Sequence, residues 1–144
     1  MSITLRAVKG TPLTIAEMDA NFTELDTRAD RSEIYQIVYS HSTSPPVSSL
    51  FDAYVFSQSV NFVAGLAGSV ARCAVSPSAD VVITFKNTLE ATVGTLTFTS
   101  ANLNGTFSWA SDRTFAATDI LSFNSPADLF GMTGIFMNLV GVKV

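Results

Sequence analysis

The sequence predicts a mostly β protein: a jelly-roll-like antiparallel β-sandwich preceded by a short N-terminal α-helix and an extended arm. Short runs of alternating apolar and polar residues follow one another from residue 53 onward, and glycine, proline, asparagine or aspartate separates most of them. About nine strands of this kind suit two packed layers. A different, helix-like spacing of apolar residues occurs near the N-terminus. The length of 144 residues suits one such domain with a small appendage.

The predicted organisation has three parts. Residues 1–33 form an arm and an oligomerisation or attachment helix, residues 34–46 form a strand and a Ser/Pro linker, and residues 47–144 form the β-sandwich head. The linker is placed at Pro45 and Pro46, because neither can donate a sheet hydrogen bond. The expected strands of the head are 53–58, 60–64, 70–75, 81–86, 94–99, 106–109, 113–116, 120–124 and 134–144.

Turn signals refine this prediction at two places. The strands at 80–85 and 94–98 suggest a hairpin whose loop is longer than the commonest two-residue turn. Asn104 and Gly105 favour the left-handed backbone conformations of a tight turn. Sequence alone does not give the order of the strands in the sheets.

The expected helix begins with a capping signal. Thr14 and Glu17 have the spacing of a capping box, in which each side chain accepts a hydrogen bond from a free backbone N–H of the first turn. Apolar residues then recur at steps of three and four, as in the a/d seam of a coiled coil. The seam comprises Ile15, Met18, Phe22, Leu25 and Ala29. The same pattern also fits a helix lying on its own domain, so two interpretations remain.

The segment Leu13–Phe22 reads LTIAEMDANF and resembles the "LTxAEMDxNF" segment near the N-terminus of many bacteriophage tail-fibre and virion-appendage proteins. The preceding Arg6, Val8, Lys9 and Gly10 fit the same pattern. The later segments 94–98 and 119–122, followed by a proline and an apolar terminal strand, resemble more loosely the compact β domains of phage structural proteins. The resemblance implies a homotrimer in which the N-terminal part attaches to the particle.

The composition indicates an unusual surface. Apolar residues make up 47% of the chain, eleven residues are phenylalanine, and only 14% are charged. Half of the charged side chains lie between Arg6 and Glu33, so the head is especially poor in charge. We therefore expect part of the head to be covered by other subunits or by a larger structure. The alternative is a surface covered by serine, threonine and asparagine, which are also abundant.

Several partners and compartments are excluded by the same counts. The net charge is −4 and there is no basic run, which argues against nucleic-acid binding. No apolar run is long enough to insert into a membrane, and no signal peptide is recognisable. We expect assembly in the host cytoplasm and a final location in the virion. The single Cys73 excludes an intrachain disulfide, and its strand-like surroundings predict a small buried residue.

No catalytic, cofactor-binding or metal-ligating residue is predicted. The one histidine, His41, lies in the linker, and no zinc, dinucleotide or phosphate-loop motif occurs. Two converging carboxylates would suffice for a glycosidase, so this class remains an alternative. The candidates are Asp52, Asp80, Glu90, Asp112, Asp119 and Asp128, of which most stand beside a turn signal, where aspartate serves backbone geometry.

Sugar recognition needs only an exposed aromatic residue with polar neighbours. Trp109, Asn104 and Asp112 are therefore possible receptor contacts. The competing interpretation puts Trp109 in the core, because the alternation at 106–109 places Phe107 and Trp109 on one face of a strand.

The sequence thus predicts a bacteriophage virion structural protein: a homotrimeric short fibre or appendage without enzymatic activity. Its partners would be copies of itself, other virion proteins of the tail, neck or capsid, and a host-surface glycan or protein. A capsid decoration protein that stabilises the head shell is one alternative. A glycan-binding or glycan-degrading module is another.

Overall fold

The computed structural model describes residues 12–144, and within its helix the side chains of residues 27–32 are outside that description. All but the last residue of the predicted arm at 1–12 therefore lies outside the described residues. The chain divides into two compact units, one ending at Ile34 and the other comprising Tyr35–Val144.

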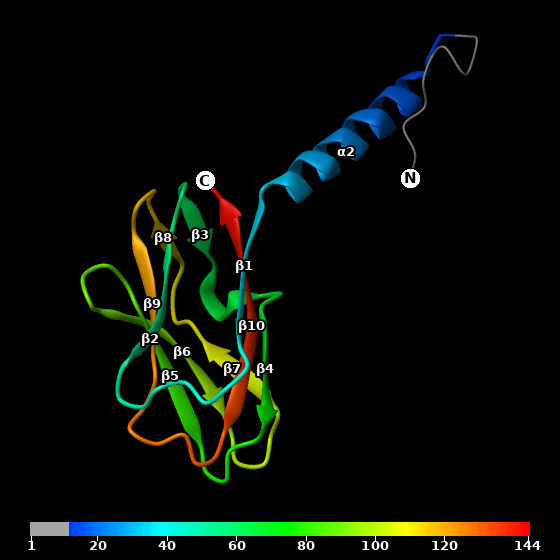
Figure 1. Ribbon diagram of the computed structural model, residues 1–144. Coiled ribbons are helices and arrows are strands. Elements are labelled where there is room, and N and C mark those ends of the chain that lie inside the picture. The colour runs from blue at the N-terminus through cyan, green and yellow to red at the C-terminus, as the bar shows by residue number, and fades with distance from the viewer. Residues whose placement is uncertain (1–11) are drawn as a thin grey trace. The chain divides into compact units, whose positions relative to one another are not determined.

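Helix α2 spans Ile15–Ser32 (Figure 1). Thr14 and Glu17 form the capping box that their spacing predicts. The Thr14 backbone N–H donates to Glu17 Oε2 over 2.7 Å, and the Glu17 N–H donates to Thr14 Oγ1 over 3.3 Å. A cap of this kind stabilises a helix by about 1 kcal/mol.

The described part of the chain continues with strands and one short 3₁₀ turn. These are β1 (Ile34–His41), β2 (Leu50–Val55), β3 (Val60–Phe62), η1 (Ala64–Leu66), β4 (Val70–Val75), β5 (Val81–Lys86), β6 (Thr92–Phe98), β7 (Asn104–Ser108), β8 (Arg113–Phe115), β9 (Ile120–Asn124) and β10 (Thr133–Lys143). They alternate between buried and exposed residues, for example along β5 and β6, because neighbouring side chains of a strand point to opposite faces.

The strands pair in the order β2-β9-β5-β6-β7-β4-β10-β3-β8, with β1 also paired to β10. The pairs along this order are antiparallel, and several join strands far apart in sequence, such as β2 with β9 and β4 with β10. Long-range antiparallel pairs of this kind are typical of Greek-key and jelly-roll connections. The prediction of a mostly β, antiparallel sandwich with one helix is confirmed.

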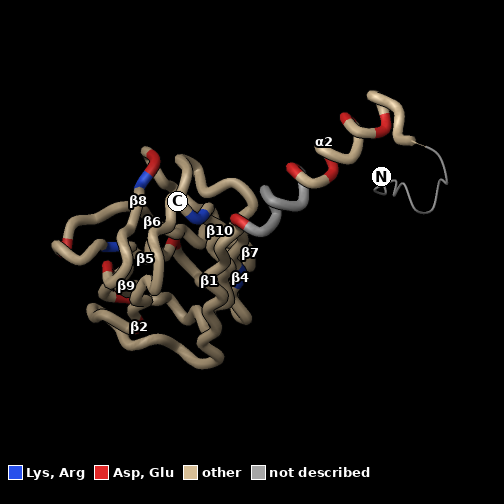
Figure 2. The backbone as a smooth tube through the Cα atoms, turned by 90° about the horizontal axis from the view of Figure 1, so that it is seen from above, with Lys and Arg blue, Asp and Glu red and all other residues tan. Residues whose placement is uncertain are grey.

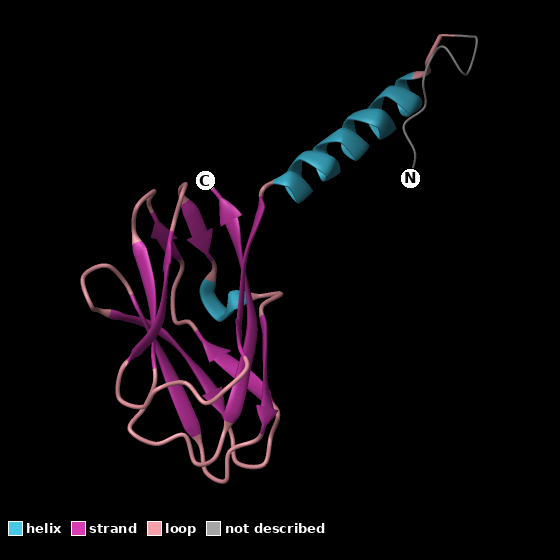
Figure 3. Ribbon diagram, viewed as in Figure 1, coloured by secondary structure: helices cyan, strands magenta, loops and turns pink. Residues whose placement is uncertain are grey.

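The hydrogen-bonded path folds over, so that strands that do not pair face each other across the core (Figure 3). The ring of Tyr39 on β1 lies 5.5 Å from that of Phe123 on β9 and 5.8 Å from that of Phe51 on β2. Phe56 and Phe115 stack at 4.7 Å. Aromatic pairs at such separations add to the free energy gained by burial. Phenylalanine therefore forms much of the core between the layers.

The sequence predicted burial for Cys73 and gave two interpretations for Trp109, one of them a place in the core. Trp109 is 3% exposed and packs against Phe62 and Phe85, so the core interpretation of this tryptophan is confirmed. Cys73 is also buried, as predicted, and burial raises the pKa of its thiol. It behaves as a small core residue.

In the segment 34–46 the predicted strand is present as β1, but the segment does not act as a linker between two parts. Its strand β1 has Ile37 buried in the core, and its proline Pro45 is also buried. The Ser125 hydroxyl donates to the Pro46 carbonyl and so ties the segment to the loop after β9. The division between units falls instead at Ile34 and Tyr35. Aromatic packing outweighs the proline signal at this point.

The turn predicted at Asn104 and Gly105 is wrong. Both residues begin β7, and the turn precedes them: Ala101 has a φ of 60°, and Asn102 Oδ1 accepts a hydrogen bond from the Asn104 N–H. Gly105 serves packing instead, because a Cβ there would lie 2.5 Å from Leu96 Cδ1. In contrast, the predicted hairpin of β5 and β6 is present, and Asn87 Oδ1 closes its loop by accepting from the Leu89 and Ala91 N–H groups.

Charged residues are sparse along the β unit, whose tube in Figure 2 is mostly uncharged. Lys86 and Glu90 form an ion pair across the β5–β6 loop, with 3.4 Å between Nζ and Oε2. Exposed pairs of this kind contribute little to stability. The fold therefore depends on its apolar core and its strand ladders.

Gly94 offers a test of the packing around Trp109. A Cβ at Gly94 would lie 2.2 Å from Trp109 Cε3 and 2.9 Å from the Ser108 carbonyl oxygen. We expect Gly94→Ala to lower the free energy of unfolding by about 1–3 kcal/mol, because the tryptophan or the backbone must move. Chemical denaturation measures the change. The control Thr92→Ala changes an exposed residue of the same strand and should stay within about 0.5 kcal/mol of wild type. Equal effects of the two variants would contradict this account.

Candidate functional site

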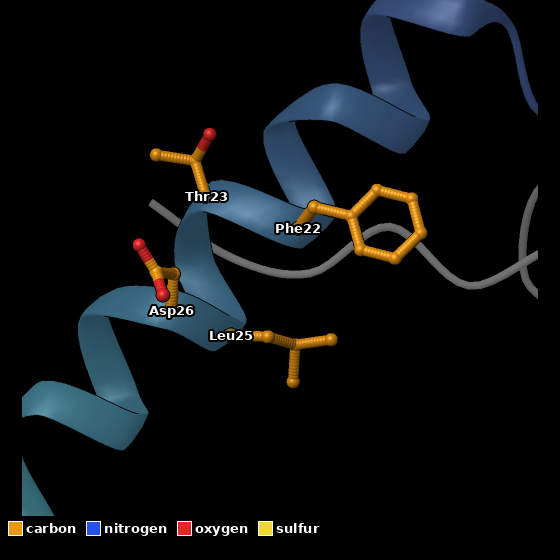
Figure 4. A pocket seen from close by; sticks show the side chains of 4 residues that line it. All are labelled: Phe22, Thr23, Leu25 and Asp26. Atoms are coloured by element: carbon orange, nitrogen blue, oxygen red, sulfur yellow. The ribbon is translucent and has the colours of Figure 1, made fainter.

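The first candidate site is the apolar face of α2, which we call the helix seam. Four of its five predicted members, Ile15, Met18, Phe22 and Leu25, are between 40% and 74% exposed. Figure 4 shows Phe22 and Leu25 projecting from one side of the helix, while Thr23 and Asp26 project from another. The fifth member, Ala29, has a side chain outside the described part. Large exposed side chains that share one face of a helix are suited to packing against another helix.

The second candidate site lies on the β unit and is a hollow of about 430 Å³. We call it the outer-face groove, because it runs across the side of β1, β10, β4 and β7 that faces away from the core. Its lining residues are Val38, Tyr39, Ser40, Val70, Ala71, Arg72, Asn104, Phe136, Met137 and Asn138. Its volume is typical of sites that bind small ligands.

Strand register places the side chains of the groove. Phe136 on β10 stands opposite Arg72 on β4, and Arg72 stands opposite Asn104 on β7. These three residues therefore form a row across adjacent strands, about 4.8 Å apart. A second row joins Asn138 on β10 with Val70 on β4. The neighbours Met137 and Ala71 point the other way and are buried.

The groove combines an apolar surface with a few polar groups. Val38 and Val70 are 75% and 64% exposed, and Phe136 is 40% exposed. Arg72 is the one charged residue among those that line it, and no ion pair of Arg72 is found within residues 12–144. Asn138 Oδ1 is buried and accepts no hydrogen bond from the described residues. An apolar site with convergent polar groups is the usual form of a binding site.

Tyr39 lies at the base of the groove and also reaches the core. Burial, with the nearby Asp52 carboxylate as a second cause, raises its pKa to about 12. Tyr35, on the same face of β1, shares a hydrogen bond between hydroxyls with Tyr54 of β2, and this bond together with burial raises the pKa of Tyr54 to about 12. Both phenols are therefore neutral at physiological pH.

The three residues that the sequence suggested as receptor contacts lie in three different environments. Trp109 is buried and offers no surface for a receptor, so this suggestion is wrong. Asp112 is exposed, but its Oδ1 accepts a hydrogen bond from the Ala64 N–H at η1, and it does not line the groove. Only Asn104 belongs to the outer-face groove.

The remaining groove residues were missed from sequence. Alternation in Val70–Cys73 does place Val70 and Arg72 on the outer face of a strand. However, only the pairing of β4 with β10 brings Phe136 and Asn138 beside them. This pairing joins segments far apart in the chain and has no local sequence signal.

The carboxylates of the β unit have structural partners. Asp52, Asp80, Asp119 and Asp128 each accept a hydrogen bond from a backbone N–H near a turn or strand end, those of Ala53, Ser100, Ala116 and Phe130 respectively. Glu90 pairs with Lys86. His41 stacks on Tyr39 and contacts the Thr43 hydroxyl. Within the residues that the structure describes, no three metal-ligating side chains converge.

Comparison with known proteins finds a distant likeness in structure. The sequence matches no family profile and no curated protein. A solved structure described as a carbohydrate-binding module CBM36 in complex with calcium and xylotriose is similar with a TM-score of 0.40 and 15% identity. The match covers 74% of this chain and 97% of that chain. Over residues 12–144, no helix has the length and apolar character needed to span a membrane.

The pKa of Tyr39 predicts the response to alkaline pH. Its folded pKa of about 12 exceeds the ordinary value of 10.0, so its stabilising contribution is complete below about pH 10 and is lost as the pH rises through about 12. We expect the melting temperature to fall between about pH 9 and pH 11.5, and to fall less in Tyr39→Phe, which cannot ionise. Thermal unfolding followed by circular dichroism measures both. The same fall in both proteins would show that Tyr39 does not contribute.

Proposed function

We propose that this chain is a non-catalytic structural subunit of a bacteriophage particle. It assembles with copies of itself through the helix seam, attaches to the virion by its N-terminal part, and presents the β-sandwich for adhesion to a host surface. The observation that carries the proposal is the exposed apolar face of α2, on a helix whose sequence resembles the N-terminal segment of phage appendage proteins.

Self-association follows from the energetics of the seam. Most of the stability of a helix in a protein comes from packing of its apolar face, and α2 has such a face on its 18 residues. Burying a large apolar side chain contributes about 1.5–3 kcal/mol, and the seam carries four such side chains in exposed positions. A second copy offers the same residues at the same steps of three and four, which is the condition for knobs-into-holes packing. The resemblance favours three copies.

The remaining parts of the proposal have separate support. The partners of the Asp52, Asp80, Asp119 and Asp128 carboxylates support a structural role for these groups and so favour binding over glycan cleavage. The sparse charge of the β unit supports contact with other subunits or virion proteins. The outer-face groove supports adhesion, since it is an apolar hollow of the β unit that contains an exposed aromatic residue. Three such sites on one trimer would bind a surface with avidity.

The assembly proposal is tested by placing charges in the seam. We expect Met18→Asp combined with Phe22→Asp to convert a trimer to a monomer, because each carboxylate would be buried without a partner in the bundle. Light scattering coupled to size exclusion measures the mass. The strand signal in circular dichroism should be unchanged.

The matched control for that variant carries the same two charges on the opposite side of the helix. Ala16→Asp combined with Ala20→Asp adds two aspartates one helical turn apart, outside the seam. It should keep the wild-type mass. A wild-type monomer, or a double seam variant that stays trimeric, would show that the helix seam is not the assembly device.

The location on the particle is tested by immunogold labelling of intact virions with antibody raised against the purified chain. A fibre or appendage predicts gold particles at the tail or neck. Gold spread evenly over the head shell would instead support a capsid decoration protein, and an unlabelled virion would contradict both roles.

A further inference from the structure

We propose that the outer-face groove binds a saccharide that carries a carboxylate, with Arg72 recognising the acid and Phe136 supporting the sugar ring. This inference rests on the proposed adhesion function and names the chemical class of its ligand. It follows from the side chains that line the groove and from the backbone pairing of the strands around it.

The apolar part of the groove suits one face of a sugar ring. A pyranose has C–H groups on its faces and hydroxyls around its edge, so it packs on an aromatic ring and hydrogen-bonds sideways. Phe136 provides an exposed ring on β10, with Val38 and Val70 beside it in the same groove. It is one of the few exposed aromatic residues of the β unit, because most of the other rings fill the core.

Arg72 selects the charge of the ligand. It is the one charged residue in the groove and stands opposite Phe136 in the strand register. No carboxylate of the described chain pairs with it. A guanidinium offers two parallel N–H donors that match the two oxygens of a carboxylate. A free arginine on a chain with a net charge of −4 therefore provides local complementarity to an acidic ligand.

Two amides provide the sideways hydrogen bonds. Asn104 lies next to Arg72 on β7 and is exposed. Asn138 lines the groove on β10, and its Oδ1 has no partner among the described residues. The terminal torsion of asparagine has broad minima, so a small rotation would direct this oxygen to a ligand hydroxyl. A ligand would thereby satisfy an acceptor that residues 12–144 leave unpaired.

The strand ladders argue against an extended peptide in this place. A peptide that adds to a sheet needs an edge with free backbone N–H and C=O groups. Along the groove, β4 already pairs with β10 on one side and with β7 on the other. At β4, recognition therefore comes from side chains on the face of the strand, which suits a compact, polyhydroxylated ligand.

Nitrogen-15 NMR of the full chain tests the proposal with three acidic probes: trigalacturonic acid, a hyaluronan hexasaccharide and 3′-sialyllactose. Each is compared with its methyl ester, a neutral counterpart that keeps the same sugar rings and hydroxyls. We expect at least one acidic probe to shift the backbone signals of Arg72, Asn104, Phe136 and Asn138. We expect its neutral counterpart to bind at least about tenfold more weakly, since it lacks the charge-assisted contact.

Variants assign the roles within the groove. Arg72→Gln should weaken the acidic probe by about tenfold and leave the affinity for the neutral counterpart unchanged. Phe136→Ala should weaken both. The control Arg113→Gln removes the same charge from an exposed residue of β8 that does not line the groove, and it should bind as wild type. Amide spectra of all variants show whether they are folded.

Four outcomes would overturn the proposal. The first two are the absence of shifts in the groove with all three acidic probes, and equal binding of the acidic and neutral forms. The third is an equal loss of affinity in Arg72→Gln and Arg113→Gln. The fourth is a lower oligomer mass of Phe136→Ala, which would identify the groove as a contact between subunits. Light scattering keeps this result separate from the assembly proposal. A trimer without groove shifts would reject only the ligand, whereas a monomer with groove shifts would reject only the assembly.

Discussion

The pairing of β10 organises the β unit. This terminal strand pairs with β1, β3 and β4 and thereby joins both ends of the unit. Its alternation places Ile135, Met137 and Leu139 in the core, while Phe136 and Asn138 face outward. The strict period of two means that a slip by one residue would exchange these sets, burying the amide and exposing the methionine. The same register therefore maintains both the core and the outer-face groove.

In the proposed function the two candidate sites have separate roles, with assembly assigned to the helix seam and ligand binding to the outer-face groove. The helix seam is apolar, repetitive and suited to a partner of identical sequence. The outer-face groove is small, has one cation and two amides, and is suited to a ligand of different chemistry. Neither site needs the other to form, because each is built from residues of one compact unit. A weak interaction in the groove gains strength only when the seam brings several copies together.

Local patterns were sufficient to predict the elements. The strands at 70–75, 81–86 and 120–124 have the predicted bounds, and the helix begins directly after Thr14 as its cap requires. Predictions failed where a distant contact overrides a local signal. Gly105 is needed for close packing against Leu96 and not for a turn. The segment around Pro45 belongs to the sandwich because Ile37 and Tyr39 are packed into it.

The candidate sites show the same difference between features set by a local pattern and features set by distant contacts. The helix seam has a local period, so its residues could be identified from sequence. The groove depends on Arg72 and Phe136 standing opposite each other on β4 and β10, a register that composition and spacing do not contain. Conversely, Trp109 was suggested as a receptor contact because tryptophan is common in sugar sites, although its position in an alternating segment already favoured the core.

The pairing of β1 with β10 also affects how the chain folds during translation. The first strand of the sandwich pairs with the last, and contacts between such distant segments form slowly because a large loop must close. Translation proceeds from the N-terminus, so α2 leaves the ribosome well before β10 exists. In the proposed assembly, the helices of neighbouring nascent chains would therefore meet while their sandwiches are still open. Association through the seam would then precede closure of the β unit, because α2 precedes β10 in the sequence.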